Sequence, residues 1–387
     1  MLWRMRGSHG RTTRDPSQSD RVSPAEARYG LLRPDDFHGL TVLLDCRWLG
    51  HGGAGRVTEL LLGEIRDRPP GSGRWLLWGD PTAVGPLAFE GAIISPWHGD
   101  PARLAGQADW FRVPHADVLI YLHQVRPLMP GRAITVVYDT IPLHIEAHPL
   151  VRLAKRAFFT AVCRLSRVIV TISAQSKLAI ISDLGVDGSR IIVANLSVDA
   201  GRIARIRALR AISDRSDTLV YVGRFGAHKN LERLCRAFST TAFRSRGGRL
   251  LLVGGSPSEA LHLGSWLREE GITGVGARGF VAEADLDLLL ATSRALVQPS
   301  LEEGYGLPAV EAAAVGLQVA ASRTGYAPEI PVEFVTFMDP LDERSIAEAI
   351  DVAVTRPDPD IIFAPRSTLR EGILEAVGRV AGRTEAG

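Results

Sequence analysis

Cysteines, long apolar runs and an excess of one charge are all scarce in this sequence. Among its 387 residues are three cysteines, Cys46, Cys163 and Cys235, and their spacing fits neither a disulfide framework nor a zinc site. No apolar stretch approaches the ~20 residues of a membrane-spanning helix. The formal net charge is only +2, which gives no indication of a nucleic-acid partner. We therefore expect a reduced, cytoplasmic protein without a metal site or a nucleic-acid partner.

Length and overall composition indicate an ordinary globular protein of two domains. Hydrophobic residues make up 45% of the chain and charged residues 23%, and 387 residues exceed what one core usually holds. Residues 1–38 contain Arg, Ser and Pro with little periodicity, which predicts a disordered tail. The Arg-rich stretch 202–217 predicts a connection between domains. We therefore expect domains at residues 39–212 and 213–387, the second with a C-terminal helix.

The stretch 299–314, PSLEEGYGLPAVEAAA, has the strongest chemical pattern in the chain. It follows the apolar run 295–297 and continues into an Ala-rich segment that Pro308 can open, so it predicts a strand, a glycine loop and a helix. Unpaired N–H groups at such a helix start bind anions, most often phosphate. Glu303 and Glu311 bracket the loop, and carboxylates suit hydroxyl donors. The stretch therefore predicts a ligand with both a diphosphate and many hydroxyls.

The two glutamates mean more together than apart. Glu311 alone would carry no functional prediction, because acids near a helix start suit the helix dipole without any ligand. With seven residues between them and GYGLP inside, Glu303 and Glu311 resemble the motif of retaining glycosyltransferases of family 4, which have the GT-B fold. The resemblance covers about residues 41–350. It implies an α/β fold of two Rossmann-like domains whose parallel sheets face a central cleft.

The resemblance also implies a role for each residue of the motif. Glu303 would bind the donor sugar and act in catalysis, and Glu311 would bind ribose hydroxyls. The N–H groups of the loop would bind the donor diphosphate. These loop residues are Gly304, Tyr305, Gly306 and Leu307.

Two cations flank another strand-to-helix turn, after the apolar run 219–222. Arg224 and Lys229 could neutralise a diphosphate, with Arg suited to a bidentate grip and Lys to a point charge. Alone they would read as surface charges, but the family places an Arg and a Lys of this spacing on the donor diphosphate. In the segment VGARGFV, Arg278 and Phe280 resemble residues that hold the nucleotide base.

A glycine cluster, HGGAGR at 51–56, follows the first predicted strand. By itself it indicates no more than a tight turn between a strand and a helix. The resemblance implies that Gly53 and Gly55 let the backbone approach the donor diphosphate closely.

Tyr138 and Asp139 end a predicted strand at 134–138, where ligands of open α/β sheets bind. Many family members have a His–Asp pair here, so Tyr138 stands where His is commonest. We expect both residues on the acceptor side and Asp139 also in catalysis. The alternatives are that Tyr138 belongs to the core and that Asp139 caps its own turn. The nearby histidines, His123 among them, have no metal-ligand spacing.

The amphipathic run 151–165 carries four basic residues. Such a helix usually packs its apolar side on a sheet, and the alternative is a peripheral contact with the inner face of a membrane. Asp285 and Asp287 form an Asp-x-Asp triplet, but they open a predicted helix where acids are common, so we do not assign them a metal.

Taken together, the resemblance implies retaining, metal-independent transfer of a hexose, by family habit mannose, from a nucleoside diphosphate sugar to a hydroxyl. The acceptor would be a saccharide or a lipid-linked saccharide in polysaccharide or glycolipid biosynthesis. No cofactor is implied beyond the nucleotide-sugar substrate. Two alternatives remain: a nucleotide-sugar epimerase on the same scaffold, and a catalytically silent subunit that partners another transferase.

Overall fold

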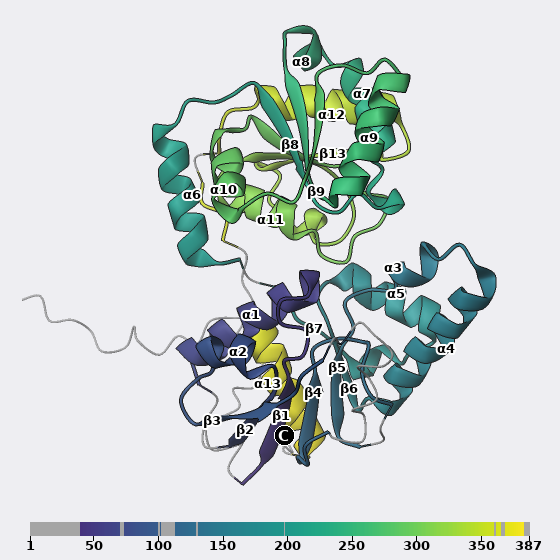
Figure 1. The fold of residues 1–387 in the computed structure, drawn as a ribbon, viewed down its shortest axis with the longest axis vertical. Coiled ribbons are helices and arrows are strands. Elements are labelled where there is room, and N and C mark those ends of the chain that lie inside the picture. Colours follow the sequence, from purple (N-terminus) through teal and green to yellow (C-terminus); the bar gives the residue numbers. More distant parts are fainter. Residues whose placement is uncertain are drawn as a thin grey trace, which may run out of the picture.

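The structure, a computed structural model, describes residues 39–69, 73–99, 101, 113–128, 131–196, 198–359, 361–364 and 368–382. The disordered tail predicted for residues 1–38 lies outside these ranges. The described chain forms two domains, each built on one sheet of parallel strands (Figure 1). The expected α/β fold with two parallel sheets is confirmed.

The first sheet has seven strands in the order β3-β2-β1-β4-β5-β6-β7. Each neighbouring pair is parallel. The strands are short and strongly apolar, as buried parallel strands are. Their bounds are Thr41–Asp45, Arg74–Gly79, Ala92–Pro96, Val118–Tyr121, Ala133–Val136, Val168–Thr171 and Ile191–Val193 for β1 to β7.

The second sheet has six strands in the order β10-β9-β8-β11-β12-β13, and these pairs are also parallel. The bounds of β8 to β13 are Thr218–Val222, Arg249–Gly255, Val275–Gly279, Ala295–Gln298, Gln318–Ser322 and Val335–Met338. Since all strands of a parallel sheet point the same way, the loops after them gather at one edge.

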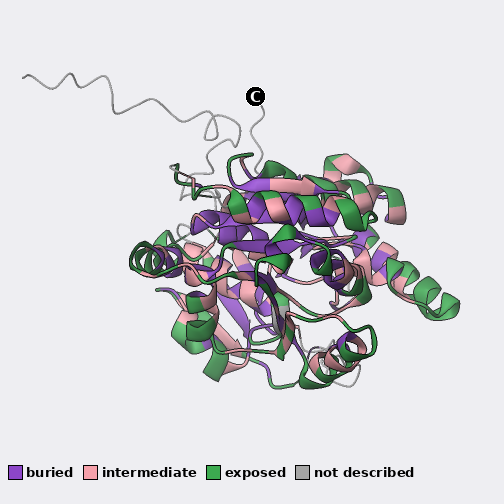
Figure 2. Ribbon diagram, turned by 90° about the horizontal axis from the view of Figure 1, so that it is seen from above, coloured by how far each residue is buried: buried purple, intermediate pink, exposed green. Residues whose placement is uncertain are grey.

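Helices connect the strands and cover the sheets, whose strands form the buried interior (Figure 2). Those between the strands of the first sheet are α1 Gly52–Asp67, α2 Pro81–Val84, α3 Ile141–His144, α4 Pro149–Leu165 and α5 Ala174–Leu184. Those of the second half are α6 Ala200–Ile212, α7 Leu231–Ser239, α8 Ala242–Ser245, α9 Pro257–Glu269, α10 Glu283–Thr292, α11 Leu307–Ala314, α12 Glu343–Thr355 and α13 Leu369–Ala381. The 3-10 turns within the described ranges are η3 Gly85–Leu87, η5 Gly188–Arg190, η6 Ala227–Lys229 and η7 Ala327–Glu329.

Two helices pack on the domain opposite to the one expected from the sequence boundaries. Helix α6 packs on the second domain, where Arg202 Nε donates to Asp287 Oδ1 of α10 at 2.7 Å. Helix α13 lies against the first sheet (Figure 1). A Cβ at Gly372 would stand 2.6 Å from Cβ of Ala194, just after β7, so a glycine allows this close approach. The chain thus crosses between the domains twice.

Candidate active site

The predicted strand, glycine loop and helix of the 299–314 stretch are present as β11, a loop and α11. Gly306 caps the helix with a φ of +85°, a left-handed conformation that favours glycine. A Cβ there would also stand 2.8 Å from Nε2 of Gln298. Pro308 lies in the first turn, as predicted. The loop conformation therefore depends on the glycine that the sequence supplies.

Lys229 and Glu303, assigned separate roles from the sequence, form an ion pair. Lys229 Nζ lies 2.6 Å from Oε1 of Glu303, and both side chains are mostly buried. The amide of Gln298 and the hydroxyl of Ser300 donate to the same oxygen at 2.8 and 2.9 Å. Within the described chain no group donates to Oε2 of Glu303. One carboxylate oxygen is thus fixed by three donors, and the other accepts no hydrogen bond from the described residues.

Arg224 lies two residues beyond β8 and its side chain is exposed. Its carbonyl oxygen accepts a hydrogen bond from the Tyr221 hydroxyl at 2.8 Å, which fixes the backbone. Among the described carboxylates, none lies within ion-pair distance of its guanidinium. Arg224 therefore offers a free cation on the same short loop that carries Lys229.

Glu311 makes a contact that local sequence reasoning missed. Its Oε1 lies 3.0 Å from Nη1 of Arg202, which also pairs with Asp287 at 2.7 Å. Burial raises the pKa of Glu311, although the charges of Arg202 and of Arg56 on α1 oppose this rise. The two acids are thus held together by one buried guanidinium. No local pattern could have paired Glu311 with a residue 109 positions away.

Asp139 lies against the glycine loop of the other domain. A Cβ at Gly304 would stand 2.5 Å from its Oδ2, so the glycine makes room for the carboxylate. The N–H of Ile141 donates to Oδ1 at 3.1 Å, which is the turn cap considered from the sequence. Burial raises the pKa of Asp139 to about 6, and the charge of Glu303 adds to the rise. Asp139 therefore caps its own turn and also lies beside the glycine loop.

Tyr138 contributes its ring to the core and its hydroxyl to the backbone. The hydroxyl donates to the carbonyl oxygen of Leu122 at 2.6 Å, and the N–H of Tyr138 donates to Gln124 Oε1 at 3.3 Å. The ring packs against the main apolar cluster. The phenolic proton is therefore used within the protein.

The glycines of the first loop have different surroundings. At Gly55 a Cβ would stand 2.7 Å from the carbonyl oxygen of Trp48, so this glycine is required by the protein's own backbone. At Gly53 a Cβ would meet nothing within 4 Å. Both lie at the start of α1, whose Arg56 acts on Glu311 across the domains. The start of α1 is therefore close enough to α11 for the charge of Arg56 to act on Glu311, and the role of Gly53 and Gly55 at a diphosphate stays a prediction.

Arg278 and Phe280 lie at the end of the edge strand β10, and both side chains are exposed. Phe280 has 89% of its surface exposed, which is unusual for a large apolar ring. Within the described residues, neither side chain forms a hydrogen bond or an ion pair with Lys229 or Glu303. The structure leaves them free at the outer end of the sheet.

Four side chains form hydrogen bonds between the second domain and the first, three of them at the glycine loop. The hydroxyls of Ser173 and Ser176 both donate to the carbonyl oxygen of Gly304, at 2.8 and 3.1 Å. The Tyr305 hydroxyl donates to the carbonyl oxygen of Leu196 at 2.7 Å. Gln175 accepts a hydrogen bond from the N–H of Gly325. The two domains therefore meet at the loop that carries the glutamate motif.

A fifth contact between the domains carries charge. His144 lies between Glu302, at 2.8 Å from Nδ1, and Asp183, at 3.0 Å from Nε2. Burial opposes the charged form, but the hydrogen bond and charge of Glu302 raise the pKa of His144 above its ordinary value.

Nowhere in the described residues do three His, Cys, Asp or Glu side chains form a group that could hold a metal ion.

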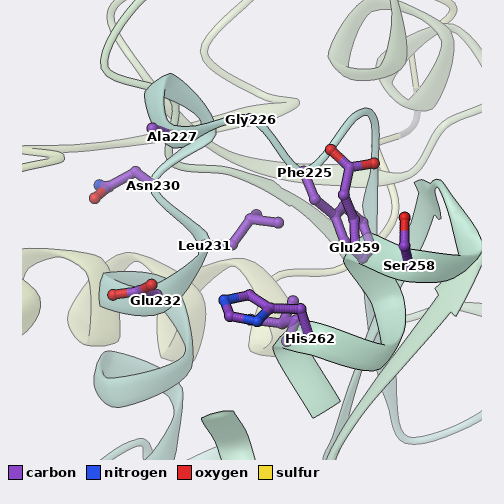
Figure 3. Close-up of a pocket in the computed structure, with 10 residues that line it drawn as sticks. Phe225, Gly226, Ala227, Asn230, Leu231, Glu232, Ser258, Glu259 and His262 are labelled. Carbon is purple, nitrogen blue, oxygen red and sulfur yellow. The ribbon is translucent and has the colours of Figure 1, made fainter. Parts of the chain in front are cut away.

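A cavity of about 460 Å³ lies between α7 and α9, and residues 225–227 of the loop before α7 also line it (Figure 3). Glu232, Glu259 and His262 line it together with Phe225. Two carboxylates are unsuited to a diphosphate, so this cavity does not match the predicted donor site.

Comparison with known proteins agrees with this geometry. Residues 203–363 match the family described as glycosyl transferases group 1. This part of the chain is therefore similar to group 1 glycosyl transferases. It contains Arg224, Lys229 and both glutamates of the motif. The segment begins within α6, contains all six strands of the second sheet and ends beyond α12, so it covers most of the second domain.

Two curated relatives match across both domains. The chain is 28% identical to O-antigen chain mannosyltransferase B of Escherichia coli over 233 residues, 57% of this chain and 60% of the relative. It is 24% identical to O-antigen chain mannosyltransferase RfbU of Salmonella typhimurium over 237 residues, 61% of this chain and 64% of that protein. In both cases the match spans less than two thirds of the relative's length.

Solved structures of glycosyltransferases share the fold. Sucrose-phosphate synthase from Thermosynechococcus elongatus has a TM-score of 0.64 at 18% identity, covering 89% of this chain and 94% of that chain. Anabaena HepE in complex with UDP and glucose has a TM-score of 0.60 at 16% identity, covering 89% and 97%. WaaG, a glycosyltransferase of lipopolysaccharide biosynthesis, has a TM-score of 0.59 at 17% identity, covering 89% and 94%. The predicted GT-B fold is confirmed.

Proposed function

We propose that this chain transfers a hexose, of the mannosyl type, from a nucleoside diphosphate sugar to a hydroxyl of a saccharide or lipid-linked acceptor, with retention at the anomeric carbon. The observation that carries the proposal is the Lys229–Glu303 pair beside the free cation of Arg224, at the loop where the two domains meet. The mannosyl group and a role in polysaccharide biosynthesis are supported by the two relatives described above, both O-antigen chain mannosyltransferases.

The charge distribution fits the departure of a diphosphate. When the bond between the anomeric carbon and the diphosphate breaks, negative charge develops on the leaving oxygen. Arg224 and Lys229 supply positive charge on one loop, and the N–H groups at residues 304–307 add donors on another. Fixed charges placed where charge develops are often the largest contribution to catalysis. In this proposal side chains supply the charge, so the transfer is metal-independent.

The carboxylates then have separate duties. The free Oε2 of Glu303 accepts a hydrogen bond from a hydroxyl of the donor sugar, while its Oε1 holds Lys229. Glu311 accepts from the ribose, and Arg202 fixes its orientation. The exposed ring of Phe280 and the guanidinium of Arg278 stack on the nucleotide base.

The proposed chemical step needs no nucleophile from the protein. The acceptor oxygen bonds to the anomeric carbon on the face from which the diphosphate leaves. Its proton passes to an oxygen of the departing diphosphate. Asp139, beside Gly304, orients the reacting hydroxyl. The close meeting of the domains at this loop limits the access of water.

Calorimetry with GDP, UDP, ADP and dTDP tests the donor site. We expect one nucleotide to bind, and Arg224→Ala to weaken that binding while Arg249→Ala, at the exposed start of β9, does not. The matching nucleotide sugar should then be consumed only with an acceptor. Altered sugar without an acceptor would identify an epimerase. No nucleotide binding would favour a silent partner subunit.

We also propose that the start of α4 contacts an anionic membrane. Leu150 and Leu153 are 71% and 63% exposed, and Arg152 and Arg156 beside them are exposed as well. Exposed leucines among basic residues are typical of interfacial helices. Among the described residues no helix combines the length and apolarity of a bilayer crossing, so the proposed contact is peripheral.

Vesicle sedimentation tests this contact. Wild-type protein should sediment with vesicles that contain phosphatidylglycerol and remain free with vesicles of phosphatidylcholine alone. The double variant Leu150→Ser, Leu153→Ser should lose most of this binding and keep its nucleotide affinity. Equal sedimentation of the variant would contradict the proposal.

A further inference from the structure

His123 stands at a position of the first sheet where ligands bind in open α/β folds. It lies two residues beyond β4, and β4 neighbours β1 in the strand order β3-β2-β1-β4-β5. The chain order reverses direction between these two strands, and a crevice forms outside their carboxyl ends. Trp48 lies on the loop after β1. The stack of His123 on Trp48 therefore spans the crevice.

The imidazole is held on three sides. Its ring stacks on Trp48 with centroids 3.9 Å apart and an interplanar angle of 28°. The ring of Tyr138 lies at 5.8 Å with a tilt of 54°. The N–H of Val125 donates to Nδ1 at 3.0 Å. Because Nδ1 accepts this bond, Nε2 carries the proton. The geometry fixes one tautomer and one ring orientation.

The edge of the ring that remains is the one that carries Nε2. His123 is partly exposed, and no group in the described chain makes a hydrogen bond to Nε2. Tyr138 offers no equivalent donor, because its own hydroxyl proton goes to Leu122. His123 is thus an oriented N–H donor at the crevice. No hydrogen bond within the described chain uses this N–H.

The charge state of the ring indicates what it would bind. Burial lowers the pKa of His123 to about 4; the charge of Asp45 opposes this shift and that of Arg47 assists it. The guanidinium of Arg47 is itself bound to Asp45 at 2.8 Å. The imidazole is therefore neutral near pH 7. A neutral N–H donor suits an uncharged hydroxyl oxygen better than a phosphate, which favours charged donors.

We propose that His123 binds the saccharide acceptor and that its Nε2–H donates to one of the acceptor's hydroxyl oxygens. This inference rests on the proposed transferase function and adds a residue to the acceptor side. It also places the acceptor over the crevice between β1 and β4, on the side of the first domain and next to the loop of Tyr138 and Asp139.

The test measures saccharide binding and nucleotide binding separately. The probes are the methyl α-glycosides of mannose, glucose, galactose and N-acetylglucosamine, titrated by saturation-transfer NMR. The variants are His123→Phe, which keeps a stacked ring without the donor, and His123→Gln, which restores an N–H. His98→Phe is the matched control, because His98 stands two residues beyond β3 and is 74% exposed.

At least one glycoside should bind the wild type. His123→Phe should weaken that binding by about 3- to 10-fold, the worth of a neutral hydrogen bond, and His123→Gln should recover most of it. Affinity for the nucleotide diphosphate should be the same in all variants. Equal glycoside affinity in wild type and His123→Phe would overturn the inference, and so would the absence of any glycoside binding to the wild type.

Two further measurements keep the result decisive. If His123→Phe does not fold, ¹⁵N NMR of the wild-type histidines takes its place, with His123 identified by its missing signals in His123→Gln. The bound glycoside must then shift the Nε2 signal of His123, and an unshifted signal rejects the inference. Failure of the transferase proposal would appear instead as a loss of all nucleotide binding.

Discussion

Ser173, which caps the start of α5 in the first domain, donates a 2.8 Å hydrogen bond to the carbonyl oxygen of Gly304 in the second domain. Ser176, one turn further along the helix, donates to the same oxygen at 3.1 Å. Both serines are buried. The loop between the two glutamates of the motif is therefore held by hydroxyl groups from outside its own domain.

Removing both hydroxyls should disturb turnover more than nucleotide binding. In Ser173→Ala, Ser176→Ala the buried carbonyl of Gly304 loses two donors, which costs about 1–3 kcal/mol of stability. We expect kcat to fall while the nucleotide Kd stays within about twofold. Ser182→Ala, on the exposed part of α5, is the control. A double variant with wild-type kcat would show that the loop needs no such support.

Lys229→Ala should reduce the rate of transfer by about 100-fold, the usual loss when one fixed donor to a developing charge is removed. The fold should survive, because Gln298 and Ser300 still donate to Glu303. Steady-state kinetics with the nucleotide sugar measures the effect. Lys155 of α4 forms a similar pair with Glu146, which precedes the helix, and Lys155→Ala should leave the rate unchanged. An equal loss in both variants would contradict the assignment.

Arg202→Met should destabilise the protein by about 3–5 kcal/mol, because it leaves Glu311 and Asp287 without their buried partner. Urea unfolding measures this loss. Arg344→Ala, which breaks an exposed pair with Glu348, should cost less than about 1 kcal/mol.

Adding Glu311→Gln to Arg202→Met should recover part of the stability, since it removes one of the uncompensated charges. If Arg202→Met and Arg344→Ala unfold at the same urea concentration, the buried ion pairs of Arg202 add nothing to the stability of the protein.

Asp139 should make stability depend on pH. Burial raises its pKa from the ordinary 3.8 to about 6 in the folded protein, so folding favours the protonated carboxyl. The free energy that protonated Asp139 contributes to stability is therefore fully present below about pH 4 and is lost as the pH rises through 6. Asp139→Asn should remove this loss, which is on the order of 2–3 kcal/mol. Urea titrations of the variant and the wild type at pH 5 and pH 8 test this prediction. The free energy of unfolding of Asp139→Asn relative to wild type must be higher at pH 8 than at pH 5.

Local pattern was sufficient for some of this structure. Pro308 and the glycines before it define a loop and a helix start within a single stretch, and Arg224 and Lys229 stand on one strand-to-helix turn. Such features depend on neighbours in sequence. The α/β architecture follows for the same reason, because short apolar strands alternate with amphipathic helices.

Other parts depend on contacts between distant residues. Arg202 and Glu311 meet only after α6 has packed on the second domain. Lys229 and Glu303 were each expected at the diphosphate or the sugar, but their ion pair joins two different loops. His123 has no spacing that indicates a role, since the backbone of Val125 and the ring of Trp48 fix it. A sequence shows the residue types and cannot show which of them the fold brings together.

The packing of α13 on the first sheet has a consequence for the order of events during synthesis. Chains fold domain by domain as they leave the ribosome, the N-terminal part first. Here the first sheet must wait for residues 369–381, which are made after the whole second sheet. Its apolar face, where Ile373 and Val377 will pack, stays uncovered for that time. The second domain is therefore able to close first, and the domain that begins the chain is the last to be completed.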